Sequence, residues 1–496
     1  MIYSKEIFTT KSNEIIPLFL SKRPVHSKYN PSSEKTILPE NYEGAVVVFG
    51  IGGGFHIKNL IDDKNISLII AVEADEESLE YSLQFENSKK LIECQKAVLC
   101  TQKDFITTLM ENYLPALHSN ITAIFLRSWE NENKETSQLL LSGFNAVIKH
   151  IKADFSVQSH FGLIWQRNIL LNLRNNFKAS QNEFPEADKN LTAAVIAAGP
   201  TLDSSIKKLK ENRKHYFIIS TDTAYPVLLA NDIIPEIAVC VDAQRISARH
   251  FMTAPEASSK NYTTFIFDIC SNPKAAEHVL ELGHKIKFIQ SGHPLSALAL
   301  CITNVPFIHT GSGTVTIACC DIARIMGFTK TELFGADFSY TNGKPYANGT
   351  YLERNFGVTG FKTNTTEQLY TSLMFRTELI PLGKSKFTTE VLEGYKKTLE
   401  DWAISSGLKI ENNILLNQCT KNKINRIESN NFSFDDFFID WKLNLENLIL
   451  KENFSVCKNE YLYSLLPFIA FLKKHEPQKS LHEYFKLALN YSLLYN

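Results

Sequence analysis

Short apolar runs alternate with amphipathic stretches through the middle of the chain, and this rhythm constrains the fold more than any other feature. The apolar runs are residues 192–198, 216–220, 237–242, 264–269, 286–290 and 332–335. Helix-like stretches such as 205–212 and 314–326 fall between them. Strands that alternate with helices form a mostly parallel sheet covered on both faces. The sequence therefore predicts an α/β fold with a Rossmann-like, doubly wound central domain.

The same reasoning divides the chain into four sections. Residues 1–125 are expected to form a smaller Rossmann-like N-terminal domain, and residues 126–185 a helical connector that ends in a polar linker. Residues 186–385 hold the central α/β domain. Residues 386–496 contain few glycines and many amphipathic stretches, so we expect a helical C-terminal domain.

A glycine turn follows the first apolar run of the N-terminal section. The sequence Gly50-Ile-Gly-Gly-Gly54, with Glu73 at the end of the next apolar run, is similar to the ligand turn of a methyltransferase that binds S-adenosylmethionine. The alternative is a Rossmann core kept without a ligand, and we favour it because no catalytic residues follow the turn. His56, beside the turn, is assigned to local packing.

Composition excludes several classes of function. The 52 basic and 53 acidic residues nearly cancel, so we expect neither nucleic-acid binding by bulk charge nor a polybasic membrane anchor. The nine cysteines are odd in number and form no CxxC pair, which predicts no disulfide framework and no zinc site. The N-terminus lacks an apolar signal core, and the longest apolar stretch, near residues 461–472, is broken by Pro467. We therefore expect a cytoplasmic protein.

Two turns rich in small residues precede helix-like stretches of the central section. Backbone N–H groups at a helix start can bind a phosphate, and the carboxyl ends of parallel strands are where such folds bind ligands. An ordinary capped turn is the alternative for each one. The candidate nucleotide-binding residues of the two turns are Gly199, Pro200, Thr201, Gly311, Ser312, Gly313 and Thr314.

Acidic residues end three of the other predicted strands. They are Asp222, which Thr223 directly follows, Asp242 and Asp268. Each of the three acids can bind a ribose, a metal or an acceptor hydroxyl. Each can equally cap the next helix.

A polar, aromatic loop follows the last strand of the central section. It contains Asp337, Tyr340, Asn342 and Tyr346. The tyrosine hydroxyls can donate to a phosphate while the rings stack on a substrate, although simple packing of the rings is the alternative.

The ordered set of these motifs resembles the central domain of the motility accessory factor (Maf) family, over roughly residues 165–385. The matching pieces are Gly199-Pro200-Thr201-Leu202, Thr221-Asp222-Thr223-Ala224, Ile234-Pro235 before Val241-Asp242, Gly311-Ser312-Gly313 and Gly335-Ala336-Asp337-Phe338. An N-terminal Rossmann-like part and a helical C-terminal part also fit that family.

The resemblance implies a glycosyltransferase. Maf proteins attach nonulosonic acids, such as pseudaminic or legionaminic acid, to serines and threonines of flagellin, which flagellar assembly and motility need. Their central domain is similar to bacterial sialyltransferases that use a CMP-activated sugar. The implied donor is a CMP-nonulosonic acid, the implied partner is flagellin, and no separate cofactor or metal is required.

The residues of the sialyltransferase motifs carry over with one departure. The glycine-proline-serine loop of those enzymes matches residues 199–201, with Thr201 in place of serine, and their tyrosine loop matches residues 335–346. Their catalytic histidine downstream of that loop has no counterpart, because the next histidine after Tyr346 is His475. The candidate catalytic residues are therefore Asp242, Asp268, Asp337 and Tyr346, with His293 and His309 as further candidates for the base.

Two other functions stay open. The same domain type is similar to archaeal 6-hydroxymethylpterin diphosphokinase, in which case Asp222 and Asp242 would hold Mg²⁺ under ATP. The missing histidine also suits a non-enzymatic chaperone or scaffold for flagellin.

Overall fold

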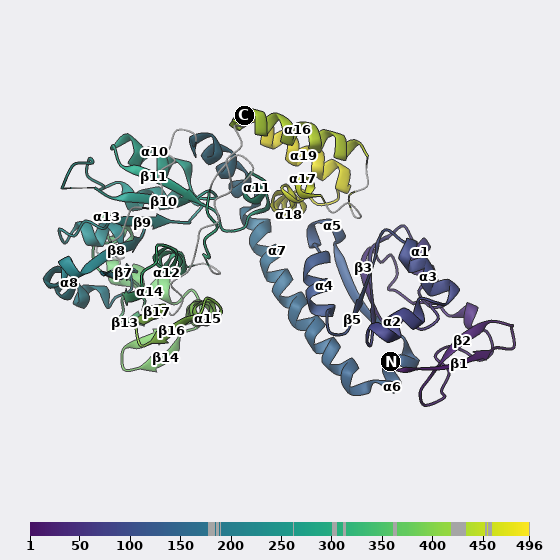
Figure 1. The fold of residues 1–496 in the computed structure, drawn as a ribbon. Coiled ribbons are helices and arrows are strands. Elements are labelled where there is room, and N and C mark those ends of the chain that lie inside the picture. Colours follow the sequence, from purple (N-terminus) through teal and green to yellow (C-terminus); the bar gives the residue numbers. More distant parts are fainter. Residues whose placement is uncertain are drawn as a thin grey trace. The chain divides into compact units, whose positions relative to one another are not determined.

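The computed structural model of the chain describes residues 1–176, 184, 188, 190–260, 262–299, 305–310, 314–360, 365–417, 433–451, 454 and 459–495. They form two compact units (Figure 1). Unit 1 consists of Met1–Leu163 and Trp441–Leu493, and unit 2 of Ile164–Asp440 and Leu494–Asn496.

Unit 1 is built on a parallel four-stranded sheet of order β5-β4-β3-β6, preceded by an antiparallel β1–β2 hairpin. Its strands are β1 (Tyr3–Thr9), β2 (Ile15–Phe19), β3 (Gly44–Phe49), β4 (Ile66–Glu73), β5 (Ala97–Thr101) and β6 (Asn120–Phe125). Its N-terminal helices are η1 (Pro31–Ser33), α1 (Lys58–Asp62), α2 (Glu76–Ser82), α3 (Glu86–Glu93), α4 (Phe105–Asn112), α5 (Pro115–His118) and α6 (Arg127–Glu132).

Strand β3 shows why this sheet forms. All its residues are buried, and successive side chains enter different cores: Val47 lies in one apolar cluster and Val48 in another. A strand that is apolar on both faces belongs in the middle of a covered parallel sheet. The predicted Rossmann-like N-terminal architecture follows from this strand and from β4.

The end of the chain adds helices to unit 1. Helix α7 (Lys134–Asn176) runs from unit 1 into unit 2, and α16 (Phe434–Leu450) runs from unit 2 into unit 1. The remaining helices are α17 (Glu460–Tyr463), α18 (Leu466–His475) and α19 (Leu481–Leu493). A β-carbon on Gly162 of α7 would lie 1.8 Å from the carbonyl oxygen of Pro467, so glycine is needed where α7 meets α18.

Unit 2 contains an eight-stranded sheet of order β11-β10-β9-β8-β7-β12-β17-β16. Its strands are β7 (Thr192–Ile196), β8 (Tyr216–Thr221), β9 (Ile237–Cys240), β10 (Thr264–Asp268), β11 (Lys285–Ile289), β12 (Lys330–Phe334), β16 (Leu408–Glu411) and β17 (Ile414–Asn417). The first six strands in that order are parallel, and β17 and β16 are antiparallel additions at one edge. A small sheet of order β13-β15-β14 is formed by β13 (Tyr340–Thr341), β14 (Ile380–Gly383) and β15 (Lys386–Thr388).

Helices connect these strands and cover the sheet (Figure 1). They are α8 (Leu202–Glu211), η2 (Arg213–His215), α9 (Tyr225–Leu229), η3 (Arg245–Phe251), α10 (Pro273–Glu281), α11 (Pro294–Leu298), α12 (Val315–Ile325), α13 (Tyr351–Thr359), α14 (Thr366–Met374) and α15 (Glu390–Ser405). The chain starts the sheet at β7, adds β8 to β11 on one side and returns to place β12 on the other. The topological switch point, where such sheets bind ligands, therefore lies between β7 and β12.

The predicted α/β fold class is confirmed, and the six predicted central strands appear as β7 to β12. Helix α7 spans most of residues 126–185, but it belongs to both units and does not form a domain of its own. The all-helical prediction for residues 386–496 is wrong in its first part, which contains β15, β16 and β17. The reason is a tight hairpin: Asn412, with a φ of +55°, turns the chain between two short strands that extend the main sheet.

Candidate functional site

Two glycines meet at the switch point of unit 2. The amide of Gly199, after β7, donates to the carbonyl oxygen of Gly335, after β12, at 2.8 Å. A β-carbon on Gly199 would lie 2.4 Å from that oxygen, and one on Gly335 would lie 2.3 Å from the carbonyl oxygen of Ala197. Gly335 also has a φ of +64°, which side chains rarely adopt. Both positions therefore need glycine so that the two loops can touch.

Asp337 caps helix α8 from this second loop. Its Oδ2 accepts a hydrogen bond from the amide of Thr201 at 2.8 Å, and its Oδ1 accepts one from the Thr201 hydroxyl. A carboxylate at a helix start is stabilised by the helix dipole. These bonds give Asp337 a structural role and occupy one of the amides expected to meet a phosphate. Nucleotide binding by Gly199, Pro200 and Thr201 stays a prediction.

The second predicted phosphate turn lies largely outside the described residues. Gly311, Ser312 and Gly313 are not among them. Thr314 is described, and its hydroxyl accepts a hydrogen bond from the amide of Thr316, so it caps α12.

Two of the predicted acids come together where β8 and β9 end. Asp222 is buried, and its Oδ1 accepts from the amide of Thr223 at 2.7 Å and from the hydroxyl at 3.1 Å. Asp242 accepts from the amide of Gln244 at 2.9 Å. Burial raises the pKa of Asp242, and the negative charge of Asp222 raises it further. The two carboxylates thus form one electrostatically coupled pair.

His250 lies close enough to this pair for both carboxylates to affect its pKa, and sequence reasoning missed it. It lies on η3, is only 5% exposed, and its ring meets the ring of Tyr351 edge-on with centroids 4.4 Å apart. Its Nδ1 is buried without a hydrogen-bond partner. Burial lowers the pKa of His250, while Asp222 and Asp242 oppose that shift. His250 is therefore mainly neutral near pH 7 and has a lone pair with which to accept a proton.

Tyr346 completes the cluster from the loop after β13. Its side chain is 37% exposed, and desolvation together with Tyr340, Tyr351 and Asp222 raises the pKa of its hydroxyl to about 12. Tyr340 itself has a raised pKa because of burial. Both hydroxyls therefore remain proton donors at neutral pH. Asn342, with a φ of +53°, turns the chain between them.

No contact between Asp268, at the end of β10, and the Asp222–Asp242 pair is described. Its Oδ1 accepts from the amide of Cys270 at 2.7 Å. Burial raises its pKa, and hydrogen bonds from Cys270 and Ser291 oppose that shift.

The two histidines named as further candidates for the base also have local surroundings of their own. His293 accepts from the amide of Leu295 at 3.2 Å, and burial lowers its pKa to about 3. The ring of His309 meets that of Phe307 edge-on at 5.0 Å. Neither is described in contact with the Asp222–Asp242 pair.

Two asparagines of α7 hold the loops that carry Asp242 and Asp268. The Asn168 amide donates to the carbonyl oxygens of Ala243 and Cys270, both at 3.0 Å. The Asn172 amide donates to those of Ile269 at 2.9 Å and Ser271 at 2.8 Å. Both asparagines are fully buried.

We expect Asn172→Leu to lower the free energy of unfolding of unit 2 by about 2–4 kcal/mol, because two buried carbonyls lose their donor. Hydrogen exchange of the amides in β9 and β10 measures this change. Asn175→Leu is the matched control, since Asn175 lies on the same helix but makes a single hydrogen bond at the surface. Equal effects from both substitutions would contradict the role of Asn172 in holding the loop after β10.

The N-terminal glycine turn is filled by side chains of unit 1. Glu73 Oε2 accepts from the amides of Ile51 at 3.0 Å and Gly52 at 3.4 Å and from the Tyr3 hydroxyl at 2.8 Å. Its Oε1 accepts from Trp129 Nε1 at 2.8 Å. The acidic residue that would bind a ribose in a methyltransferase therefore bonds the turn itself. This arrangement agrees with a Rossmann core kept without a nucleotide.

Comparisons with known proteins match two parts of the chain to two different family models. Residues 7–98 match the family model of the glycosyltransferase Maf N-terminal domain, and residues 167–343 match that of 6-hydroxymethylpterin diphosphokinase MptE-like proteins. The chain is also similar over its whole length to the structure of the Maf glycosyltransferase from Magnetospirillum magneticum AMB-1. The match covers 100% of this chain and 87% of that chain, with a TM-score of 0.55 and 14% sequence identity. At this identity the match shows a similar fold. The chain carries a Maf glycosyltransferase N-terminal domain and has the fold of a Maf glycosyltransferase.

Two uncharacterized proteins of Treponema pallidum (strain Nichols) are similar in sequence to parts of this chain. One is 38% identical over 146 residues, which are 29% of this chain and 52% of the relative. The other is 34% identical over 150 residues, which are 30% of this chain and 71% of the relative. The chain thus spans about half the length of the first relative.

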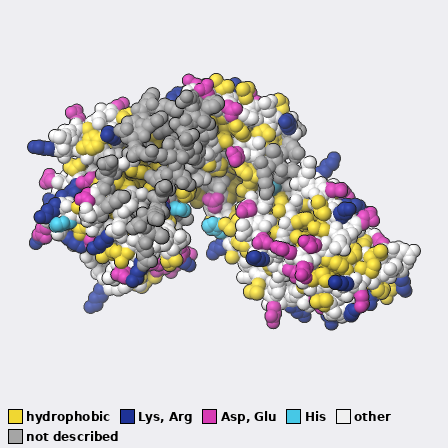
Figure 2. Space-filling model, viewed as in Figure 1, with side chains coloured by type: hydrophobic (Ala, Val, Ile, Leu, Met, Phe, Trp, Pro, Cys, Tyr) yellow, Lys and Arg dark blue, Asp and Glu magenta, His cyan; other side chains and the backbone are white. Residues whose placement is uncertain are grey.

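Two surface properties bear on the partners of the chain. Among the described residues, no helix combines the length and apolar character needed to cross a bilayer. Figure 2 shows basic and acidic side chains intermixed on the visible face of unit 2, in keeping with the near-zero net charge. The absence of a nucleic-acid partner stays a prediction.

Proposed function

We propose that unit 2 transfers a nonulosonic acid from a CMP-activated donor to serine or threonine hydroxyls of flagellin. The observation that carries this proposal is the cluster at the ends of β8 and β9, where neutral His250 lies close to Asp222 and Asp242 beside Tyr346. The match of residues 7–98 to the Maf glycosyltransferase N-terminal domain supports the reaction class. The donor, the acceptor and the part in motility are proposed from the resemblance of the sequence motifs.

In the proposed reaction, His250 supplies the base that the tyrosine loop lacks. The acceptor oxygen forms a bond to the anomeric carbon of the sugar while its proton passes to His250. The bond from that carbon to the phosphate oxygen breaks, and CMP leaves with the electron pair. Asp222 and Asp242 stabilise the imidazolium that forms, since both carboxylates favour the charged ring.

The leaving phosphate needs stabilisation of its growing negative charge. Tyr346 and Tyr340 keep their protons at neutral pH and can donate to it. The start of α12 at Thr314 offers further amides. We propose no metal for this step, because a phosphate already makes a good anionic leaving group.

The pH dependence of transfer follows from His250. The pKa of His250 lies below its usual value of 6.5, so the neutral, active form predominates above that pH and is lost as the pH falls through the lowered pKa. We expect kcat/KM to stay level between pH 7 and pH 8 and to fall only in the acid range. A rate profile over pH 4–9 measures this. An acid limb with its midpoint above pH 7 would contradict the assignment of His250.

The test of the proposed function is a transfer assay. Purified protein is incubated with flagellin and a CMP-activated nonulosonic acid, and released CMP is measured together with the mass of intact flagellin. The proposal expects equal amounts of CMP and of sugar added to flagellin. Absence of both would refute it and favour a chaperone or scaffold that binds flagellin without modifying it.

A pyrophosphoryl transferase is the second candidate. It is favoured by the match of residues 167–343 to MptE-like proteins and by the paired carboxylates of Asp222 and Asp242, which suit Mg²⁺ under ATP. Calorimetry with ATP and Mg²⁺, compared with CMP alone, separates the two. Binding of ATP that depends on Mg²⁺ and on both carboxylates would replace the first proposal with this one.

A further inference from the structure

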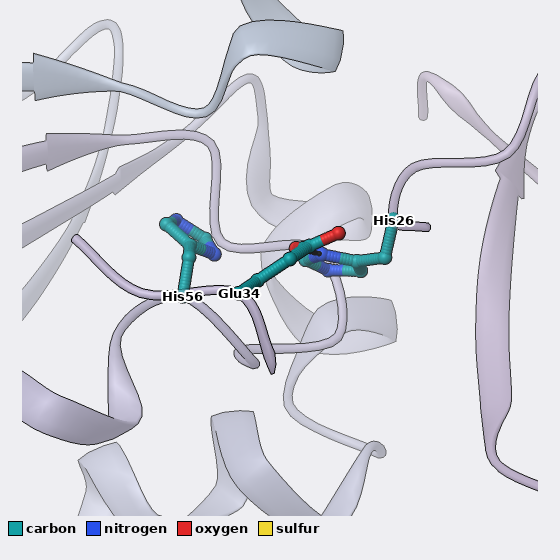
Figure 3. Close-up of side chains that lie close together, drawn as sticks. All are labelled: His26, Glu34 and His56. Atoms are coloured by element: carbon teal, nitrogen blue, oxygen red, sulfur yellow. Dashed lines mark hydrogen bonds and ion pairs between the residues drawn. The ribbon is translucent and has the colours of Figure 1, made fainter. Parts of the chain in front are cut away.

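Three potential metal ligands converge in unit 1, whereas the chemistry proposed above is assigned to unit 2. His26 and Glu34 lie in the connection between β2 and β3, and His56 lies just after the glycine turn. One ligand atom of each lies within 4.8 Å of those of the other two, the one such group found among the described residues. Figure 3 shows the Glu34 carboxylate against the His26 ring and a nitrogen of His56 turned toward both.

His56 is the member of this group whose ring nitrogens are both buried without a well-formed hydrogen bond. It is 6% exposed, and the backbone of Gly50 interacts with the ring. Buried polar atoms in folded proteins are normally paired, and an imidazole aimed at a carboxylate and a second imidazole suits a metal ion.

His26 and Glu34 form the other side of the group. His26 Nδ1 and Glu34 Oε2 lie 2.6 Å apart, and the second carboxylate oxygen accepts from the amide of Ser27, also at 2.6 Å. The His26 side chain is completely buried, whereas that of Glu34 is 24% exposed. Solvent therefore reaches the group from the side of Glu34, where a water could complete the coordination of an ion.

The ring proton of His26 has a defined place. His26 Nε2 accepts from the amide of Gly53 at 2.8 Å, so the proton of the neutral ring is on Nδ1 and points at Glu34. A metal on Nδ1 replaces that proton, which moves to Nε2, and the amide of Gly53 then loses its acceptor. The Nε2 proton would then face the Gly53 N–H, so metal binding costs this hydrogen bond and requires the glycine turn or the ring to shift, set against two metal–nitrogen bonds and one metal–carboxylate bond.

We propose that His26, Glu34 and His56 bind a divalent transition metal of the Zn²⁺ type that ties the β2–β3 connection to the glycine turn. Two imidazoles and a carboxylate are a common ligand set for such ions, with a fourth position left to water. This site is separate from the transfer site proposed in unit 2. It would replace the assignment of His56 to local packing.

Binding of Zn²⁺ to the full chain tests the proposal. Protein stripped with a chelator is titrated with Zn²⁺ against a chromogenic chelator, and bound metal is counted by mass spectrometry. We expect one ion per chain, an affinity reduced about 10- to 100-fold or more by Glu34→Gln and His56→Ala, and no change with His150→Ala. His150 is an exposed histidine of the same unit and serves as the matched control. Because Glu34 is partly exposed, Glu34→Gln decides the test even if His56→Ala does not fold.

Two further measurements separate this site from binding by cysteines. Co²⁺ at the proposed site should absorb without the thiolate charge-transfer band that a cysteine site shows. Hydrogen exchange of the Gly53 amide should become faster when the metal binds, because its acceptor is lost. No bound ion, a thiolate band, or an affinity unchanged by Glu34→Gln would each overturn the proposal.

Discussion

Replacement of His250 by alanine should slow sugar transfer by about two to four powers of ten, the usual contribution of a general base. The fold should tolerate the change, because Nδ1 of His250 has no hydrogen bond to lose. Its ring does contact that of Tyr351, so far-UV circular dichroism and the melting temperature should be measured beside the rate. The rate is measured as CMP released per unit time with flagellin in excess.

The matched control is His215→Ala. His215 is an exposed histidine on η2 in the same unit, and it should leave the rate unchanged. Asp242→Asn should lower the rate less than His250→Ala, because it removes one of two charges that stabilise the imidazolium. A His250→Ala protein that transfers sugar within threefold of the natural rate would remove His250 from the mechanism.

Substitution of Gly335 by alanine should lower the free energy of unfolding of unit 2 by about 2–5 kcal/mol. About 1–2 kcal/mol comes from the left-handed backbone and about 1–3 kcal/mol from crowding. The crowding is specific, since the new β-carbon would lie 2.3 Å from the Ala197 carbonyl oxygen. Hydrogen exchange of β7 and β12 amides measures the effect within unit 2.

Two other glycines separate strain from crowding. Gly343 also has a positive φ, of +72°, but a β-carbon there would meet nothing within 4 Å, so Gly343→Ala should cost only the backbone contribution, about 1–2 kcal/mol. Gly357, in α13, has neither a positive φ nor a close neighbour, and alanine there should be neutral or slightly stabilising. Equal effects at all three positions would contradict the contact between the β7 and β12 loops.

Local sequence patterns were sufficient to predict most of the strands and helices of the fold. Runs such as Ala193–Ala198 predict strands because apolar residues on both faces require a covered sheet, and the helices between them make that sheet parallel. The β16–β17 hairpin was missed because its strands are short and polar residues alternate in β16. Pairing with β12, which no local pattern reveals, stabilises them.

The site depended more on contacts between distant residues. Asp222 and Asp242 were found because each follows a strand, and parallel strands end at one edge of the sheet. His250 was missed because it lies upstream of the tyrosine loop; the basic stretch Arg245–His250 after the β9 end was the available signal. The bond from Thr201 to Asp337 joins residues 136 positions apart, so only the structure could show that Asp337 caps α8.

The location of bound CMP tests the central claim most directly. A crystal of the protein soaked with CMP should show the nucleotide at the carboxyl ends of β7, β8 and β9. Its phosphate should lie within hydrogen-bonding distance of Tyr346. The phosphate oxygen that carries the sugar in the donor should point toward His250. CMP bound in the glycine turn of unit 1, or an empty edge above Asp222 and Asp242 at saturating CMP, would contradict the account.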